Sequence, residues 1–195
     1  MKKNFYYPSK LNTFAFIMCG FGDFFLALNA VLKTELHFKL GILSFLIAQL
    51  CFSYMYNSKI GFYKDAPKFN FFHFFPYLLY GGTLLIILKI WKLNIVLRIA
   101  VSVYMFAICL MAKSATASYF ENKKTKLSFL RLLGSISFIF SDSLIAIGAF
   151  SKYYEIYNIP SNIITVTIMV KYWIALYFFA ISFEEIYDVE NEKKE

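Results

Sequence analysis

Six apolar runs, each about 20 residues long, constrain what this chain can fold into more than any other feature. A helix needs roughly 20 apolar residues to cross ~30 Å of hydrocarbon, so each run is long enough to span a bilayer. Hydrophobic residues make up 59% of the 195 residues and charged residues only 16%, a balance that a soluble domain of this size could not bury. We therefore predict a single all-α domain over residues 1–195, a polytopic transmembrane helical bundle with short loops. The predicted helices cover about residues 13–31, 38–56, 71–90, 94–112, 128–150 and 163–183.

The basic residues gather beside the predicted spans. A formal net charge of +8 could indicate nucleic-acid binding in a soluble protein. Here thirteen of the 20 Lys and Arg residues lie on the side of the amino terminus and six on the opposite side. Because cytoplasmic loops carry the excess of Lys and Arg, we expect both termini, including the acidic tail at 184–195, in the cytoplasm. The pattern predicts a multi-pass protein of the cell (inner) membrane whose partner is the lipid bilayer and not nucleic acid.

Two aspartates, Asp23 and Asp142, each interrupt the middle of an apolar run. A carboxylate at that depth costs roughly 2.5 kcal/mol or more on insertion scales, so it rarely stays there without a function. Counting along the helices at 1.5 Å per residue places Gln49 and Lys171 at about the same depth as the two aspartates. Four polar side chains on four predicted helices therefore form one layer near the bilayer midplane.

Small residues share the helix faces of both aspartates. Residues three, four or seven positions apart lie on the same side of a helix, and small ones allow neighbouring helices to approach closely. We therefore expect both aspartates to face the bundle interior, in one pocket. The small residues are Cys19, Gly20, Ala27 and Ala30 for Asp23, and Ser135, Ala146 and Ala149 for Asp142.

Purely structural roles are the alternatives for these residues. Asp23, Asp142 and Lys171 could form a buried ion pair or triad that only fixes the helix register, although apolar packing would stabilise the fold as well. Gln49 alone is more typical of a helix–helix hydrogen bond, and Tyr104, like Tyr172 and Trp173, of packing. The sequence has no metal-ligand spacing and no nucleotide-binding loop, so we expect neither a metal nor another cofactor.

Six short segments carry a family resemblance over nearly the whole chain. They are Gly22 to Leu26 (GDFFL), Gly41 to Gln49 (GILSFLIAQ), Tyr104-Met105, Met111-Ala112, Phe140 to Ala146 (FSDSLIA) and Lys171 to Ala175 (KYWIA). In order and spacing they resemble the Gly-Asp-x-x-Leu, Phe-x-x-Ser-Asp-x-x-Leu-Ala and related elements of the lysoplasmalogenase-like membrane proteins, the YhhN family. Two positions differ from the family pattern: Gln49 stands where histidine is typical, and Leu176 where glutamine is typical.

The resemblance implies hydrolysis of the vinyl ether bond of a lysoplasmalogen to a fatty aldehyde and a glycerophospho-base. Enol ethers are cleaved by acid, which requires one protonated carboxyl group and one carboxylate, as in the glycosidases. Our hypothesis makes Asp23 and Asp142 this acid/base pair. A membrane lipid or lysophospholipid would be the substrate. The side chains expected to line its site are Gln49, Ser141, Lys171 and Tyr172.

Two other classes of function stay open at this point. One is a lipid-binding or structural membrane protein that keeps the bundle without catalysis. The other is a proton-linked transporter that uses the intramembrane acids, although the sequence lacks the inverted repeats and the paired broken helices of many transporters.

Overall fold

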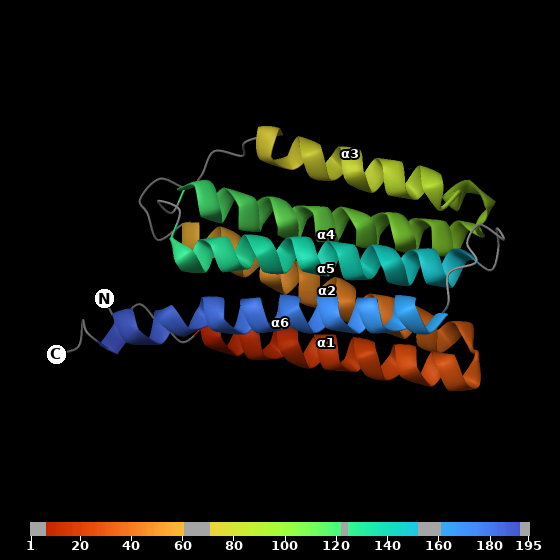
Figure 1. Ribbon diagram of the computed structural model, residues 1–195, viewed down its shortest axis with the longest axis horizontal. Helices are drawn as coiled ribbons and strands as arrows, with labels where there is room; N and C mark the ends of the chain where they lie inside the picture. Colours follow the sequence, from red (N-terminus) through yellow and green to blue (C-terminus); the bar gives the residue numbers. More distant parts are fainter. Residues whose placement is uncertain (1–6, 61–70, 122–124, 152–160, 192–195) are drawn as a thin grey trace.

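The computed structural model describes residues 7–60, 71–121, 125–151 and 161–191, and within these ranges it contains helices and no strands. This confirms the predicted all-helical bundle. Successive helices alternate in direction, so α1 begins and α6 ends at the same end of the molecule (Figure 1). The helices are α1 (Tyr7–Leu32), α2 (Glu35–Ile60), α3 (Phe71–Ile87), α4 (Ile95–Glu121), α5 (Lys126–Ser151) and α6 (Ser161–Asn191), with a short 3-10 turn at Ile90–Lys92.

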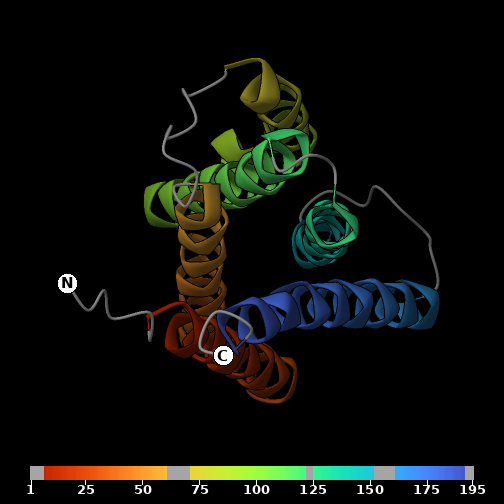
Figure 2. The same ribbon diagram turned by 90° about the vertical axis from the view of Figure 1, so that its left-hand side faces the viewer.

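Five helices form an incomplete ring, and α3 lies outside it. Neighbours in the ring pack in the order α1, α2, α4, α5 and α6, and α3 packs on α4 (Figure 2). The ring is weakest between its two end helices, because α1 packs mainly on α2 and α6 mainly on α5. We call this boundary between α1 and α6 the seam.

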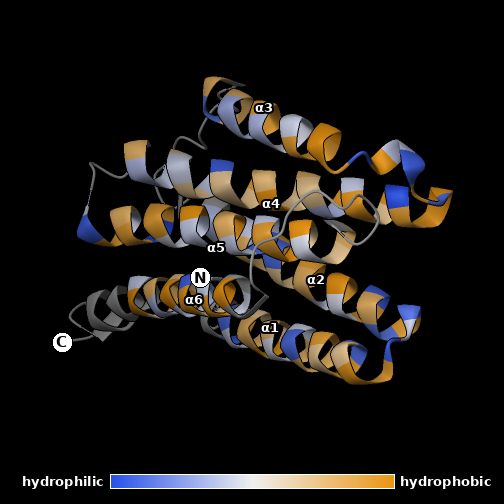
Figure 3. Ribbon diagram, turned by 45° about the vertical axis from the view of Figure 1, so that its right-hand side comes forward, coloured by the Kyte–Doolittle hydropathy of each residue, from blue (hydrophilic) through white to orange (hydrophobic). Residues whose placement is uncertain are grey.

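Within the described residues, five helices are long and apolar enough to cross a membrane, one fewer than the sequence predicts. Hydrophobic residues dominate the middle of the helices, and hydrophilic ones gather at several helix ends (Figure 3). The predicted span that is too short is α3. Its 17 residues extend ~25 Å, which is less than ~30 Å of hydrocarbon. It ends at Ile87 and not near residue 90, because Lys89 adopts the left-handed conformation (φ 47°) that terminates helices.

Two helices extend well beyond their predicted ends. Helix α4 continues past residue 112 to Glu121 through a buried stretch of mostly small residues. Helix α6 continues to Asn191. Most of the expected acidic tail therefore prolongs α6, and residues 192–195 lie outside the described ranges. Which end of the bundle faces the cytoplasm stays a prediction.

Two of the basic residues that we expect beside the membrane spans are buried inside the bundle instead. Lys113 and Arg131 are 6% and 5% exposed, within α4 and α5. The Arg131 guanidinium donates hydrogen bonds to Ser118 Oγ on α4 (3.2 Å) and to the Ser182 carbonyl on α6 (2.9 Å). Arg131 therefore connects three helices near the end where α1 begins.

Aromatic rings fill the centre of the ring of helices. The Phe138 ring lies 5.6 Å from the Tyr172 ring, and Phe45 lies 6.0 Å from Tyr172, both edge to face. Phe52 and Phe179 approach to 4.8 Å. All five side chains are buried, so α2, α5 and α6 are held together by a continuous apolar core.

Two glycines permit the closest helix contacts. A Cβ atom at Gly22 would lie 2.6 Å from the Phe45 ring, and one at Gly134 would lie 2.6 Å from the Phe179 ring. Neither ring can move aside easily, because each is buried among other rings of the core. A side chain larger than hydrogen at either position would therefore overpack the core.

We expect Gly22→Ala to lower the thermal stability of the detergent-purified protein, because overpacking a filled core typically costs about 1–3 kcal/mol. Gly20→Ala is the matched control on the same helix, since a Cβ there has no atom within 4 Å. This control should leave stability unchanged or slightly higher, because alanine favours helix over glycine. Equal melting temperatures for the two variants would contradict the close contact at Gly22.

Candidate functional site

Two tyrosine–aspartate pairs form the polar layer of the bundle. The Tyr104 hydroxyl on α4 donates a hydrogen bond to Asp142 Oδ2 on α5. The Tyr172 hydroxyl on α6 donates to Asp23 Oδ2 on α1 at 2.9 Å. Each bond joins two helices, and the second one bridges the seam.

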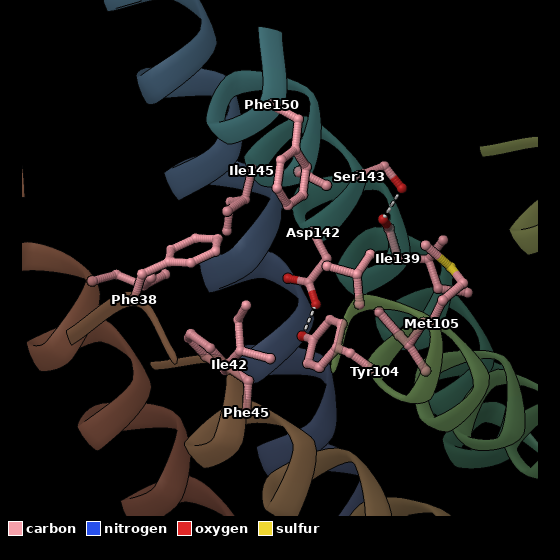
Figure 4. Close-up of a pocket in the computed structure, with 14 residues that line it drawn as sticks. Phe38, Ile42, Phe45, Tyr104, Met105, Ile139, Asp142, Ser143, Ile145 and Phe150 are labelled. Carbon is pink, nitrogen blue, oxygen red and sulfur yellow. Dashed lines mark hydrogen bonds between the residues drawn. The ribbon is translucent and has the colours of Figure 1, made fainter. Parts of the chain in front are cut away.

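Asp142 and Tyr104 face an apolar cavity between α1, α2, α4 and α5 (Figure 4). The enclosed volume of the cavity is about 60 Å³, and its mouth is open. Its third polar group is Ser143, whose hydroxyl bonds the Tyr80 hydroxyl of α3 at 2.6 Å. The remaining lining is hydrophobic: Leu26, Phe38, Ile42, Phe45, Val101, Met105, Ile108, Ile139, Ile145, Ala146 and Phe150.

Asp23 lies close to this site but outside the cavity lining. The two aspartates are near enough to interact electrostatically, and the buried Cys19 thiol lies near both of them. Unlike Asp142, Asp23 is exposed, as are Gly20 and Ala27 on the same face of α1. The expectation that both aspartates face the interior therefore holds only in part for Asp23, whose carboxyl group reaches inward to the buried Tyr172 while the residue stays open at the seam. The reason is that α1 is an end helix of the ring, so this face looks out of the seam.

Gln49 is completely buried one helical turn beyond Phe45 on α2. Its amide lies beside the Tyr104 hydroxyl. Neither amide atom makes a hydrogen bond of normal geometry with a protein group among the described residues. The structure thus places Gln49 next to the Tyr104–Asp142 pair, as the shared depth predicted.

Ser141 and Lys171 point away from the cavity. Ser141 is buried and donates to the Ile168 carbonyl of α6 at 3.1 Å, which is a contact between helices. Lys171 is exposed, with its Nζ 5.9 Å from the centre of the Phe140 ring. Successive residues of a helix point about 100° apart, so the inward positions of Asp142 and Tyr172 turn these neighbours elsewhere.

Asp23, Asp142 and Lys171 do not form the buried ion triad that was the structural alternative. Lys171 lies over the Phe140 ring instead, and the salt bridge between Lys39 and Glu35 at 2.9 Å lies on the exposed start of α2. Each aspartate is instead satisfied by a neutral tyrosine hydroxyl. The polar layer is therefore acidic.

Sequence reasoning missed Tyr104, Cys19 and Ser143 as neighbours of Asp142. The sequence alone indicates a packing role for Tyr104, yet a tyrosine near the middle of a membrane helix needs a partner for its hydroxyl. This need for a hydrogen-bond partner, together with two aspartates that the sequence leaves without an evident partner, is a signal that could have identified Tyr104 as a site residue. Cys19 and Ser143 carried no comparable signal, because small residues are equally common at plain helix contacts.

The long apolar helices, with two tyrosine–aspartate pairs at mid-depth, define an integral membrane protein built as a helical bundle. The chain belongs to the YhhN family, whose family model matches residues 2–183. No curated protein and no solved structure matches the chain.

A double-mutant cycle checks the Tyr104–Asp142 hydrogen bond. We expect Tyr104→Phe and Asp142→Ala to couple by about 1 kcal/mol in unfolding free energy, near the values measured for bonds between membrane helices. The control cycle combines Asp142→Ala with Tyr177→Phe, a change at an exposed tyrosine of α6, and should show no coupling. Equal coupling in both cycles would mean that the bond is absent.

Proposed function

We propose that this protein is an integral membrane hydrolase of the lysoplasmalogenase type. It cleaves the vinyl ether bond of a lysoplasmalogen and releases a fatty aldehyde and a glycerophospho-base. The observation that carries the proposal is the Asp142 carboxyl group, which is oriented by Tyr104 at the wall of an apolar cavity. Membership of the YhhN family supports the same class of activity.

The cavity suits an amphiphile with one hydrocarbon chain. Small-molecule sites are mostly apolar with a few placed polar groups, and the lining of this cavity has that character. An alkyl chain would contact rings and branched side chains such as Phe38, Ile42 and Phe150. The enol ether, which is the polar end of that chain, would then lie against Asp142.

Asp142 supplies the proton in this mechanism, because it is the carboxyl group of the cavity lining. Tyr104 occupies Oδ2, so Oδ1 is the oxygen that presents the proton to the substrate. The proton adds to the β-carbon of the enol ether as the carbon–carbon double bond opens. The products of this step are an Asp142 carboxylate and an oxocarbenium ion.

Water completes the reaction. Its oxygen forms a bond to the oxocarbenium carbon, and one of its protons returns to Asp142, which restores the acid and leaves a hemiacetal. The hemiacetal then collapses as its hydroxyl proton moves to the glycerol oxygen and the bond between that oxygen and the carbon breaks. Asp23 stays outside the lining, and its negative charge stabilises the cation from across Cys19.

Asparagine substitutions test these two roles in purified protein reconstituted with lysoplasmalogen, with released aldehyde as the readout. Asp142→Asn should lower turnover by about 10²–10⁴, the usual contribution of a general acid. Asp23→Asn should lower it by only about tenfold, since a charge several Å away contributes on the order of 1–2 kcal/mol. Ser141→Ala is the control for structural disturbance and should retain activity.

Full activity of Asp142→Asn would remove that residue from the mechanism. If the unmodified protein released no aldehyde from any vinyl ether lipid, the hydrolase proposal would fail. Retained lipid binding in that case would favour the non-catalytic class, and solute uptake driven by a pH gradient would favour a transporter.

Lys171→Gln should leave aldehyde release unchanged, because the Lys171 ammonium group lies over Phe140 on the outer face of the bundle. The measurement is kcat/KM for the same lipid in the same vesicles. A large loss of kcat/KM would show that Lys171 reaches the substrate and would contradict its position on the outer face.

A further inference from the structure

Two opposite charges lie on the outer surface of the bundle at one depth. Asp23 on α1 and Lys171 on α6 are both exposed. The Tyr172 hydroxyl donates to the Asp23 carboxyl group, so Lys171, which directly precedes Tyr172, lies at nearly the same level of the membrane as Asp23. The Lys171 ammonium group stays at that level, because its Nζ lies 5.9 Å from the centre of the Phe140 ring, two residues from Asp142.

Neither charge forms an ion pair within the described parts of the chain. Asp23 accepts a hydrogen bond from the neutral Tyr172 hydroxyl, and Lys171 lies on the face of an aromatic ring. Charged side chains within membrane spans almost always face the protein interior or pair with one another. In a separate protomer a local defect of the bilayer has to accommodate each charge, which costs free energy. Both charges therefore favour a partner outside the protomer.

The side chains around the two charges are complementary in size. Beside Asp23, Gly20 and Ala27 are exposed, and a Cβ atom at Gly20 would have no atom within 4 Å. Small residues of this kind let another membrane helix approach closely. The α1 face thus has room for a long side chain beside a carboxyl group, and the α6 face supplies one in Lys171. Next to Lys171 the outward face of α6 carries larger exposed side chains, which are Val170, Ile174 and Tyr177.

We propose that a second copy of this chain covers these faces, in a two-fold symmetric dimer with two reciprocal Asp23–Lys171 ion pairs. A two-fold axis along the membrane normal keeps every residue at its own depth, so residues of one level meet across the interface. Asp23 of one protomer then meets Lys171 of the partner subunit, and the same pair forms a second time. The inference is independent of the proposed function, because it concerns the outer faces of α1 and α6.

A second copy suits these faces better than a lipid does. The charges of a phospholipid lie in its head group at the membrane surface, so they do not reach two residues near the middle of the hydrocarbon. The second copy carries both a carboxyl group and an ammonium group at the required depth. The charge pattern is therefore self-complementary, as the interface of a two-fold dimer has to be.

Exchange of the two charges tests the proposal. The readout is fluorescence energy transfer between labelled full-length copies in phosphatidylcholine vesicles over a range of protein-to-lipid ratios. Lys171→Asp brings acids together at both contacts and Asp23→Lys brings bases together, so each variant alone should dimerise at least about tenfold more weakly than the unmodified chain. A mixture of the two variants restores both ion pairs and should dimerise as the unmodified chain does. Lys39→Asp, at the exposed start of α2, is the control and should not change dimerisation.

Cysteine cross-linking locates the interface without removing either charge, in a background whose three native cysteines are replaced by alanine. Gly20 lies about one turn before Asp23, and Ile174 lies about one turn after Lys171. Since α1 and α6 run in opposite directions, Gly20 and Ile174 also share one level. Gly20→Cys in one copy should therefore form a disulfide with Ile174→Cys in another. Phe106→Cys, at an exposed position of α4, is the control partner for Gly20→Cys and should form none.

Three results would overturn the inference. The first is an unmodified protein that stays monomeric at every protein-to-lipid ratio. The second is a dimer that Lys171→Asp does not weaken. The third is a cross-link from Gly20→Cys to Phe106→Cys in place of Ile174→Cys, which would put the interface on another face. If a charge variant loses its helical circular dichroism, the cross-linking result decides, because those variants keep both charges. Aldehyde release enters none of these readouts, so a failure of the proposed function is scored separately.

Discussion

The hydrogen bond from Tyr104 to Asp142 is the contact on which the organisation of the site depends most directly. A membrane bundle offers little water to a buried carboxyl group, so the protein itself must satisfy it. Tyr104 does this from α4 and thereby fixes α4 against α5. The same bond occupies one carboxyl oxygen and leaves the other for the cavity. One hydroxyl therefore meets a requirement of the fold and, in the mechanism that we propose, a requirement of the chemistry.

The aromatic core connects this polar layer to the helix contacts. Phe45 fills the space left by Gly22 on α1, lines the cavity and packs edge to face on Tyr172. Tyr172 in turn reaches across the seam to Asp23. The position of one ring thus depends on a close glycine contact, and the position of a site hydroxyl depends on that ring. Packing and polar geometry are not separable in this part of the bundle.

Much of the fold follows from the sequence, because the length of an apolar run and the depth of a polar residue depend only on helix geometry. Counting residues along the helices predicts the same membrane depth for Asp142 and Gln49. In the structure, both side chains lie beside Tyr104. The direction of a side chain is harder to predict, since a shift of one position turns it by about 100°. Lys171 and its neighbour Tyr172 have the same depth but opposite surroundings. The exposure of Asp23 could not be predicted either, because it depends on which helices close the ring and not on α1 itself.

The exposure of Asp23 has a consequence for the surrounding lipid. A carboxyl group on the outside of a membrane helix is accommodated by a local defect, in which the bilayer thins and solvent penetrates toward the charge. We therefore expect the lipid beside α1 to be wetter than the lipid beside the purely apolar faces of the bundle. Such a local thinning of the bilayer would let water reach the membrane interior without a continuous pore through the protein.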